Sequence, residues 1–240
     1  MYQNKKKIIL CGYNWAGCKA LELLLERNFE VFVYTHESPW YVNNLIEYCN
    51  YKKVKFSTEK ITINNLPFLP NVITSIYYRY IFDQDIINIV NKKIFNLHPS
   101  LLPEYKGCSS LTWAIINGES NCGFTYHYIQ KEVDKGNIIF QLKEKIYEFD
   151  TQQSLYSRIM FKSLEHFNEV LDMVIAGNPG KVQPNKGSFH KRGCPHNGEL
   201  SREWDINKQK RFIKAMINPP LEPAKLEGQN IFSFDNLENI

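Results

Sequence analysis

The sequence predicts an α/β protein whose central sheet is mostly parallel. The chain opens with a short apolar run at residues 8–11, which ends at Gly12 and is typical of a strand buried on both faces. An amphipathic helical pattern follows at residues 18–27, and a β-branched and aromatic run follows at 29–35. Strand, glycine turn, helix and strand in this order begin a βαβ unit, whose two strands are parallel.

The alternation of strand and helix patterns continues along the chain. We expect further strands at residues 71–77, 94–98, 123–129, 138–142 and 145–147, and helices at 38–56, 83–92, 111–117 and 154–176. The last helix ends at Gly177-Asn178-Pro179-Gly180, a cluster typical of a boundary. We therefore divide the chain into a main domain at 1–180 and a short C-terminal appendage at 181–240, where the pattern is poor.

Composition excludes several classes of protein. The 240 residues are 43% hydrophobic, which is too apolar for a disordered chain, and the net charge of +4 is too small for a dedicated nucleic-acid binder. No apolar run reaches the roughly 20 residues of a membrane-spanning helix. The six cysteines form no C-x-x-C pair and no zinc-ligand set, which favours reduced thiols in a cytoplasmic protein. We expect no metal, no nucleic-acid partner and no membrane partner.

The segment from Asn96 to Gly107 carries the first candidate functional residues. Asn96 and His98 are two residues apart on a predicted strand, so their side chains point to the same face. They lie at the end of that strand, where open parallel sheets bind ligands, and Pro99 and Pro103 stiffen the following loop. An amide and an imidazole together suit a reaction that forms an oxyanion and moves a proton. The same spacing also fits a capping Asn and an ordinary His.

Asp134 is the third candidate. It precedes Gly136 and the strand predicted at residues 138–142. A carboxylate at this point can reach His98 across the strand ends, orient the imidazole and raise its pKa. Taken alone, an ordinary hairpin Asp is the better explanation.

Together these residues resemble a known signature, that of the 10-formyltetrahydrofolate-dependent formyltransferases. The matching segments, all in order, are residues 96–103, 105–107, 113–115, 117–119, 123–127 and 134–139. The similarity is dense from 94 to 140 and weaker but collinear from 8 to 180. It implies a Rossmann-like formyltransferase domain, which agrees with the βαβ interpretation.

The resemblance also implies roles for individual residues. Asn96, His98 and Asp134 match the catalytic trio of that family. The formyl donor is 10-formyltetrahydrofolate, whose pterin is held by backbone groups in a pocket with two walls. One wall corresponds to Tyr80, Ile81 and Phe82, and the other to Lys131 and Glu132.

Among the branches of the family, the chain looks most like the sugar N-formyltransferases. Bulky Tyr13 and Trp15 depart from the glycine-rich turn of the phosphoribosylglycinamide branch. Only about sixty residues follow Gly180, fewer than the basic tRNA-binding domain of the methionyl-tRNA branch. The resemblance implies a nucleotide-linked amino sugar as acceptor, dTDP-linked 4-amino-4,6-dideoxyglucose above all, in the synthesis of O-antigen or surface-glycan precursors, and a homodimer.

Several side chains near these segments have two interpretations. Arg79 either binds the diphosphate of the substrate bidentately or stacks on a neighbouring tyrosine, and we assign it to substrate binding with Tyr77 and Tyr78. Lys106 either meets a phosphate or is a solvated loop lysine, and we place it in the same group. His127 is expected to be structural or to contact a sugar hydroxyl. Outside these segments, Trp204 is expected to pin the tail rather than to stack on a base.

Two other functions remain open at this point. The first is formylation of another amine, including methionyl-tRNA. The second is a catalytically silent relative that binds folate or a nucleotide sugar. The intact trio of Asn96, His98 and Asp134 favours an enzyme.

Overall fold

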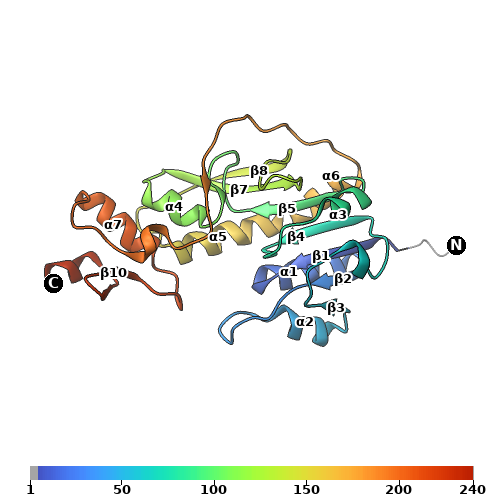
Figure 1. The fold of residues 1–240 in the computed structure, drawn as a ribbon, viewed down its shortest axis with the longest axis horizontal. Coiled ribbons are helices and arrows are strands. Elements are labelled where there is room, and N and C mark those ends of the chain that lie inside the picture. Colours follow the sequence, from blue (N-terminus) through green and yellow to red (C-terminus); the bar gives the residue numbers. More distant parts are fainter. Residues whose placement is uncertain (1–4, 240) are drawn as a thin grey trace. The chain divides into compact units, whose positions relative to one another are not determined.

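The computed structural model describes residues 5–239, and its centre is a seven-stranded sheet (Figure 1). The strand order is β3-β2-β1-β4-β5-β7-β8. The strands are β1 (Lys7–Gly12), β2 (Glu30–Tyr34), β3 (Phe56–Ser57), β4 (Val72–Ile76), β5 (Ile94–His98), β7 (Asn121–Tyr128) and β8 (Ile138–Lys145). The pairs β1–β2, β1–β4, β2–β3 and β4–β5 are parallel, as the sequence predicted.

The first βαβ unit is closed by a pair of glycines. Helix α1 (Asn14–Glu26) begins four residues before its predicted start, and in its first turn the Asn14 side chain accepts a hydrogen bond from the Ala16 backbone at 2.8 Å. A Cβ on Gly17 would lie 3.0 Å from Leu45 and 3.3 Å from the Gly12 backbone. Two glycines at these positions therefore let the start of α1 approach the end of β1.

The helix predicted at residues 38–56 is shorter in the structure. Helix α2 (Leu45–Lys52) begins where the Asn44 side chain accepts a hydrogen bond from the Ile46 backbone at 2.9 Å, and it ends at Lys53 in the left-handed conformation. These two ends leave a long connection between β2 and α2. The prediction of one long helix was wrong because it ignored this N-cap.

Strand order reverses beside β1, and open α/β sheets usually bind ligands at such a point. The chain goes from β1 to β2 and β3 on one side, and then crosses to β4, α3 (Gln84–Ile89) and β5 on the other. Ile86 and Ile87 of α3 are buried in a core cluster with Ile9 and Ile73 of the sheet. Each fully buried aliphatic side chain contributes roughly 1.5–3 kcal/mol to folding. The carboxyl ends of β1 and β4 therefore border the topological switch point.

The helix predicted at residues 154–176 is broken into α5 (Gln152–Glu165) and α6 (Phe167–Ile175). The break lies at His166, whose backbone has φ −92° and ψ 0°. The buried Tyr126 hydroxyl donates to the Ser163 carbonyl at 2.9 Å. A regular helix would pair that carbonyl with residue 167, so this side chain competes with the helical ladder at the break.

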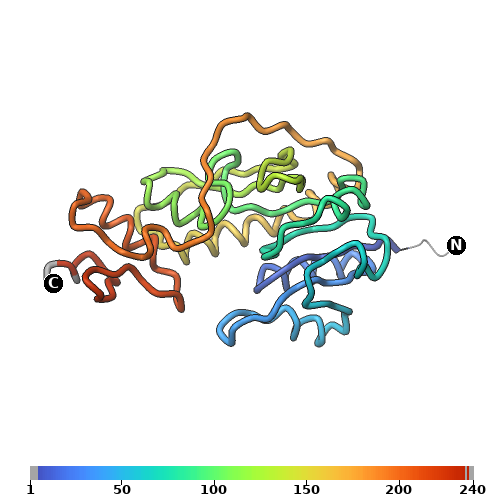
Figure 2. Tube along the Cα trace, viewed as in Figure 1, coloured from blue at the N-terminus to red at the C-terminus, as the bar shows by residue number. Residues whose placement is uncertain are grey.

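The remaining elements lie in the loops and the tail. They are β6 (Lys106–Gly107), α4 (Ser110–Ile116), β9 (Phe189–His190), α7 (Ile206–Ala215), β10 (Ala224–Leu226), β11 (Gln229–Ile231) and the 3-10 turns η1 (Ile63–Asn65), η2 (Pro195–Gly198) and η3 (Phe234–Asn239). Between α6 and β9 the chain forms a long loop, visible in the tube of Figure 2.

The tail is more ordered than its sequence suggested. Helix α7 is capped by Asp205, which accepts from the Lys208 backbone at 2.9 Å, and it buries Phe212 and Ile213. The Trp204 ring lies 5.1 Å from Phe212. Both rings belong to the tail, so this contact packs the tail on itself, and the pinning of the tail to the core by Trp204 stays a prediction.

Contacts divide the chain into two units. The first consists of the described residues up to His98 with 126–140 and 162–183, and the second consists of 99–125, 141–161 and 184 onward. The predicted domain boundary after Gly180 lies three residues before the first unit ends at Gln183. The tail thus belongs to a unit that also contains two internal segments.

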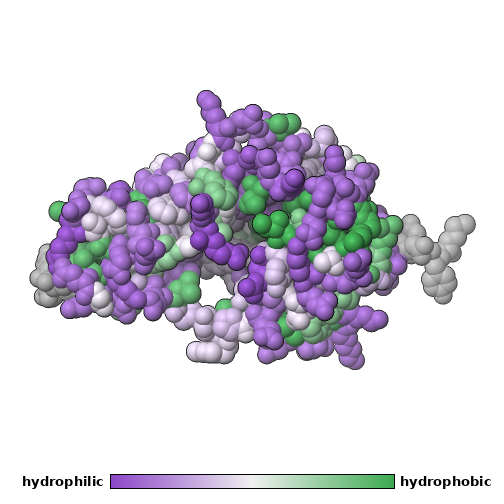
Figure 3. All heavy atoms as spheres, viewed as in Figure 1, coloured by the Kyte–Doolittle hydropathy of each residue, from purple (hydrophilic) through white to green (hydrophobic). Residues whose placement is uncertain are grey.

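Hydrophilic side chains cover most of the face shown in Figure 3. Within residues 5–239, no helix is both long enough and apolar enough to cross a membrane.

Candidate functional site

Asn96 and His98 lie at the carboxyl end of β5, on one face of the strand. His98 is buried, with 5% of its surface exposed, and Asn96 is half-buried. β5 is inserted between β4 and β7 in the sheet. The strand therefore holds both side chains on a rigid element, at the edge where open parallel sheets usually bind ligands.

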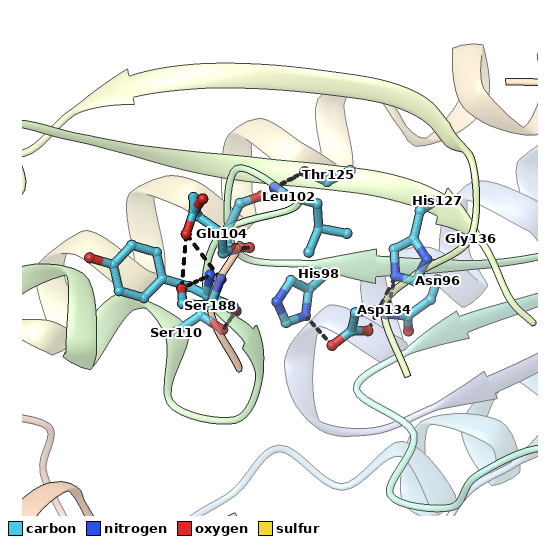
Figure 4. Close-up of polar contacts among 12 residues, drawn as sticks. Asn96, His98, Leu102, Glu104, Ser110, Thr125, His127, Asp134, Gly136 and Ser188 are labelled. Carbon is cyan, nitrogen blue, oxygen red and sulfur yellow. Dashed lines mark hydrogen bonds and ion pairs between the residues drawn. The ribbon is translucent and has the colours of Figure 1, made fainter. Parts of the chain in front are cut away.

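Asp134 faces His98 from the turn between β7 and β8 (Figure 4). Its Oδ2 lies 3.5 Å from His98 Nδ1, and its side chain is only 10% exposed. A carboxylate at this distance stabilises the protonated imidazole and directs Nε2 of the ring away from itself. The structure thus brings the predicted trio together.

His127 joins this group, although the sequence suggested only a structural role or a sugar contact. Its Nδ1 lies 2.9 Å from the Tyr128 carbonyl, so Nδ1 carries a proton. Its Nε2 lies 3.2 Å from Asn96 Nδ2 and 3.4 Å from Asp134 Oδ1. The neutral ring therefore accepts from the Asn96 amide, whereas the protonated ring would donate to Asp134.

The signal for His127 was present in the sequence. On the strand β7, Tyr126 and Tyr128 alternate with His127, so the imidazole lies on the opposite face from the tyrosines. Strand β7 lies next to β5 in the sheet, and the sequence pattern did not reveal this pairing. The missing information was the pairing of strands, not the residue pattern.

The turn that carries Asp134 is conformationally restricted. Asp134 has φ 54°, in the left-handed region, where Asp is better tolerated than most residues. A Cβ on Gly136 would lie 1.7 Å from the Tyr128 carbonyl oxygen, so this position requires glycine. Small changes in this turn therefore move the carboxylate.

The loop that follows His98 along the chain is fixed by Thr125, which Figure 4 shows beside Leu102, and by a glutamine of the second unit. Thr125 Oγ1 donates to the Ser100 carbonyl at 2.6 Å and accepts from the Leu102 backbone at 3.2 Å. Gln141 Nε2 donates to the Leu102 carbonyl at 2.9 Å and to Thr125 Oγ1 at 2.8 Å. These bonds agree with the stiff loop that the prolines predicted.

The residues assigned to substrate binding follow β4. Tyr77 has φ 62° and ends the strand. The Tyr78 ring packs against the core cluster, and its hydroxyl accepts from the Ile61 backbone at 2.9 Å. Arg79 is exposed, and its guanidinium lies 5.4 Å from the Tyr80 ring centre. Of the three, Arg79 presents its charged end to solvent, while Tyr78 has a structural partner.

Lys106 lies in the second unit and is buried, with 8% of its surface exposed. Its Nζ donates to the Lys186 carbonyl at 3.2 Å, three residues before β9, whose Phe189 pairs with Lys106. It is therefore not a solvated loop lysine. Its assignment to phosphate stays a prediction.

The segment assigned to the pterin pocket contains no helix or strand, so the sheet does not use its backbone groups. Ile81 is 67% exposed, whereas Phe82 is buried in the core cluster. On the other assigned wall, Lys131 and Glu132 are exposed, and Glu132 pairs with Lys135 at 2.5 Å.

Two residues at the switch point were not predicted. Tyr13 follows β1 and His36 follows β2, and their rings stack with centroids 4.0 Å apart. Burial, with the positive charge of Arg79, lowers the pKa of His36 to about 4, and its Nδ1 is buried without a partner. His36 is therefore neutral near pH 7 and beside the cation of Arg79.

Comparisons with known proteins identify chains that are similar to this one. A family model described as formyl transferase matches residues 3–171. The GDP-perosamine N-formyltransferase of Brucella melitensis biotype 1 is 37% identical over 164 residues, which cover 68% of this chain and 63% of that protein. The bifunctional polymyxin resistance protein ArnA of Wigglesworthia glossinidia brevipalpis is 34% identical over 230 residues, which cover 89% of this chain and 35% of that protein. The chain thus spans less than two thirds of the length of these curated relatives.

Solved structures share the fold. The N-formyltransferase from Helicobacter canadensis, in complex with folinic acid and dTDP-3-aminofucose, superposes with a TM-score of 0.83 at 23% identity, over 95% of this chain and 87% of that one. A 4-N formyltransferase from Francisella tularensis gives 0.79 at 20% identity, over 94% and 95% of the two chains.

Proposed function

The chain belongs to the formyl transferase family, and from this premise we propose that it moves a formyl group from 10-formyltetrahydrofolate to the amino group of a nucleotide-linked amino-dideoxy sugar. The observation that carries the proposal is the approach of Asp134 to His98, at 3.5 Å, beside Asn96 on β5. An amide donor, an imidazole and a carboxylate in this arrangement serve acyl transfer to an amine.

Each member of the trio has a distinct role in this reaction. The Asn96 amide donates to the oxygen that gains negative charge when the amine adds to the formyl carbon, and one such donor contributes roughly 2.7–4 kcal/mol. His98 accepts the proton that leaves the amine and passes it to N10 of the folate, the leaving group, as the bond between the formyl carbon and N10 breaks. Asp134 orients the His98 ring and stabilises its protonated form.

Arg79 is the residue that we assign to the diphosphate of the acceptor. A guanidinium matches phosphate oxygens bidentately, and Arg79 lies where the strand order reverses. His36 supports this assignment, because burial and Arg79 lower its pKa to about 4 and thus keep it uncharged. A neutral ring there adds no second titrating charge to the subsite. Tyr77, Tyr78 and Lys106 stay predictions for the same substrate.

The formyl donor fits the segment from Tyr80 to Phe82. Backbone groups outside the sheet suit the donor and acceptor edge of a pterin, and the exposed Ile81 side chain offers an apolar contact. Lys131 and Glu132 are proposed for the opposite wall. The donor itself supplies the activated formyl group.

The nucleotide that carries the acceptor sugar is a separate proposal. The prediction was dTDP-linked 4-amino-4,6-dideoxyglucose as the acceptor, formylated by a homodimer on a route to O-antigen or other surface glycans. Similarity to a GDP-perosamine N-formyltransferase adds GDP-perosamine as a rival acceptor.

A turnover assay with a panel of acceptors tests the proposal. The panel contains dTDP-, GDP- and UDP-linked 3-amino and 4-amino hexoses with 10-formyltetrahydrofolate, and mass spectrometry reads the gain of one formyl group. A gain on one member supports the function and identifies the acceptor. No gain on any sugar, with formylation of methionyl-tRNA, would overturn the sugar assignment. If no amine gains a formyl group, the proposal that the chain is a formyl-transferring enzyme would be overturned.

A further inference from the structure

Gln183 connects the loop after α6 to the turn that carries Asp134. Its Nε2 donates to the Asp134 carbonyl at 2.9 Å and to the Gly136 carbonyl at 2.7 Å. All three residues belong to the first unit, although 49 positions separate Gln183 from Asp134 in the sequence. One side-chain amide therefore binds both ends of a three-residue turn.

The chemistry of this contact requires an amide. Carbonyl oxygens only accept hydrogen bonds, and the glutamine NH₂ group has one hydrogen for each of them. This fixes the orientation of the amide, and it leaves Gln183 Oε1 buried without a partner. A carboxylate at the same place would set an oxygen against two carbonyl oxygens.

The turn needs such support because its own conformation is restrained at both ends. Asp134 has a left-handed backbone with φ 54°, which is unusual for a residue with a Cβ. The backbone of Gly136 approaches the Tyr128 carbonyl so closely that no side chain fits. The position of the Asp134 carboxylate relative to His98 thus depends on a short turn that Gln183 bridges.

We propose that Gln183 is a positioning residue, which holds the turn at residues 134–136 so that the Asp134 carboxylate stays against His98. The expected effect on kcat rests on the proposed function, whereas the expected effect on the position of Asp134 does not. Two titratable groups that face each other across Asp134 are His98 at 3.5 Å and His127 at 3.4 Å. Loss of the carboxylate would therefore lower the pH at which His98 loses its proton.

The test compares Gln183→Met with a matched control. Methionine keeps the length of the side chain and removes both donors without adding charge. Gln209 provides the control, because its Nε2 also donates to two backbone carbonyls, those of Arg202 at 3.3 Å and Trp204 at 2.8 Å, in the tail. Gln209→Met removes the same kind of clamp from a different loop.

Two readouts separate positioning from general damage. We expect Gln183→Met to lower kcat by about tenfold or more, with each KM within about twofold, since small displacements at a reacting site have effects of this size. We expect the His98 titration midpoint, followed by NMR of the free protein, to fall by about 1 pH unit. Gln209→Met should change neither quantity.

A fall in kcat with an unchanged His98 midpoint would overturn the proposal, because a merely structural role would produce that pattern. Should Gln183→Met not fold, Gln183→Ala, which leaves room for a water, is measured instead with the same criteria. If the wild-type protein formylates no amine, the proposed function fails, and the His98 midpoint in the variants still decides whether Gln183 positions Asp134.

Discussion

Replacement of His127 by phenylalanine tests how the site holds Asn96, the proposed oxyanion donor. The ring size is kept, and three polar contacts of the imidazole are removed. These are the bond from Nδ1 to the Tyr128 carbonyl at 2.9 Å, the bond from Asn96 Nδ2 to Nε2 at 3.2 Å, and the approach to Asp134 at 3.4 Å. Asn96 then loses the contact that orients its amide.

The expected size of the effect follows from these contacts. Leaving the Tyr128 carbonyl without its donor costs about 1–3 kcal/mol of stability. If the Asn96 amide turns away from the reacting oxygen, the reaction loses about 2.7–4 kcal/mol of stabilisation, which is about a hundredfold to a thousandfold in kcat. The KM values should change little, because the amide acts on charge that develops during the reaction.

The assay is a double-mutant cycle on kcat with Asn96→Ala, His127→Phe and the double variant. If His127 acts through Asn96, its replacement costs little in the Asn96→Ala background. His166→Phe is the matched control, because its imidazole also stacks in the first unit, on Phe140. Fully additive losses in the two single variants would refute the reasoning.

Three further outcomes are expected. Arg79→Gln should raise the KM for the nucleotide sugar about tenfold or more, and an unchanged KM would contradict the assignment of Arg79 to the diphosphate. Burial and the charge of Arg79 lower the pKa of His36 to about 4 in the folded protein, against about 6.5 in the unfolded chain. Between these two values the unfolded chain binds a proton that the folded protein does not bind. The free energy of unfolding therefore declines as the pH falls through this range. Urea denaturation of His36→Gln at about pH 7 and about pH 5 should show a smaller decline in the free energy of unfolding than in the wild type. An equal decline in both proteins would contradict this contribution of His36. Asp150 is 1% exposed and accepts two hydrogen bonds from the Arg158 guanidinium, at 2.8 and 2.6 Å. Asp150→Ala should therefore lower the free energy of unfolding by about 3–5 kcal/mol. A calorimetric loss below about 1 kcal/mol would show that this ion pair does not stabilise the fold to that extent.

The sequence predicted the sheet better than the helices. Apolar runs between glycines and prolines fix buried strands, and β1, β2, β4 and β5 lie within two residues of their predicted bounds. Helix ends depend on single hydrogen bonds that periodicity does not reveal. The Asn44 cap shortened α2, and the Tyr126 hydroxyl takes the Ser163 carbonyl beside the break between α5 and α6.

The candidate site was predictable where residues lie close in sequence or belong to a known signature. Asn96 and His98 share a strand, and the family resemblance added Asp134. Contacts that depend on strand pairing or long loops were not predictable from one sequence. His127 meets Asn96 because β7 lies beside β5, and Gln183 reaches Asp134 across 49 positions.

The most direct test of the central claim is the turnover of His98→Asn on the acceptor that the panel identifies. The account predicts a fall in kcat of about a hundredfold or more, with binding of the formyl donor and of the nucleotide sugar retained, and comparable losses for Asn96→Ala and Asp134→Ala. Turnover within tenfold of wild type in all three variants would contradict the assignment of this site to formyl transfer.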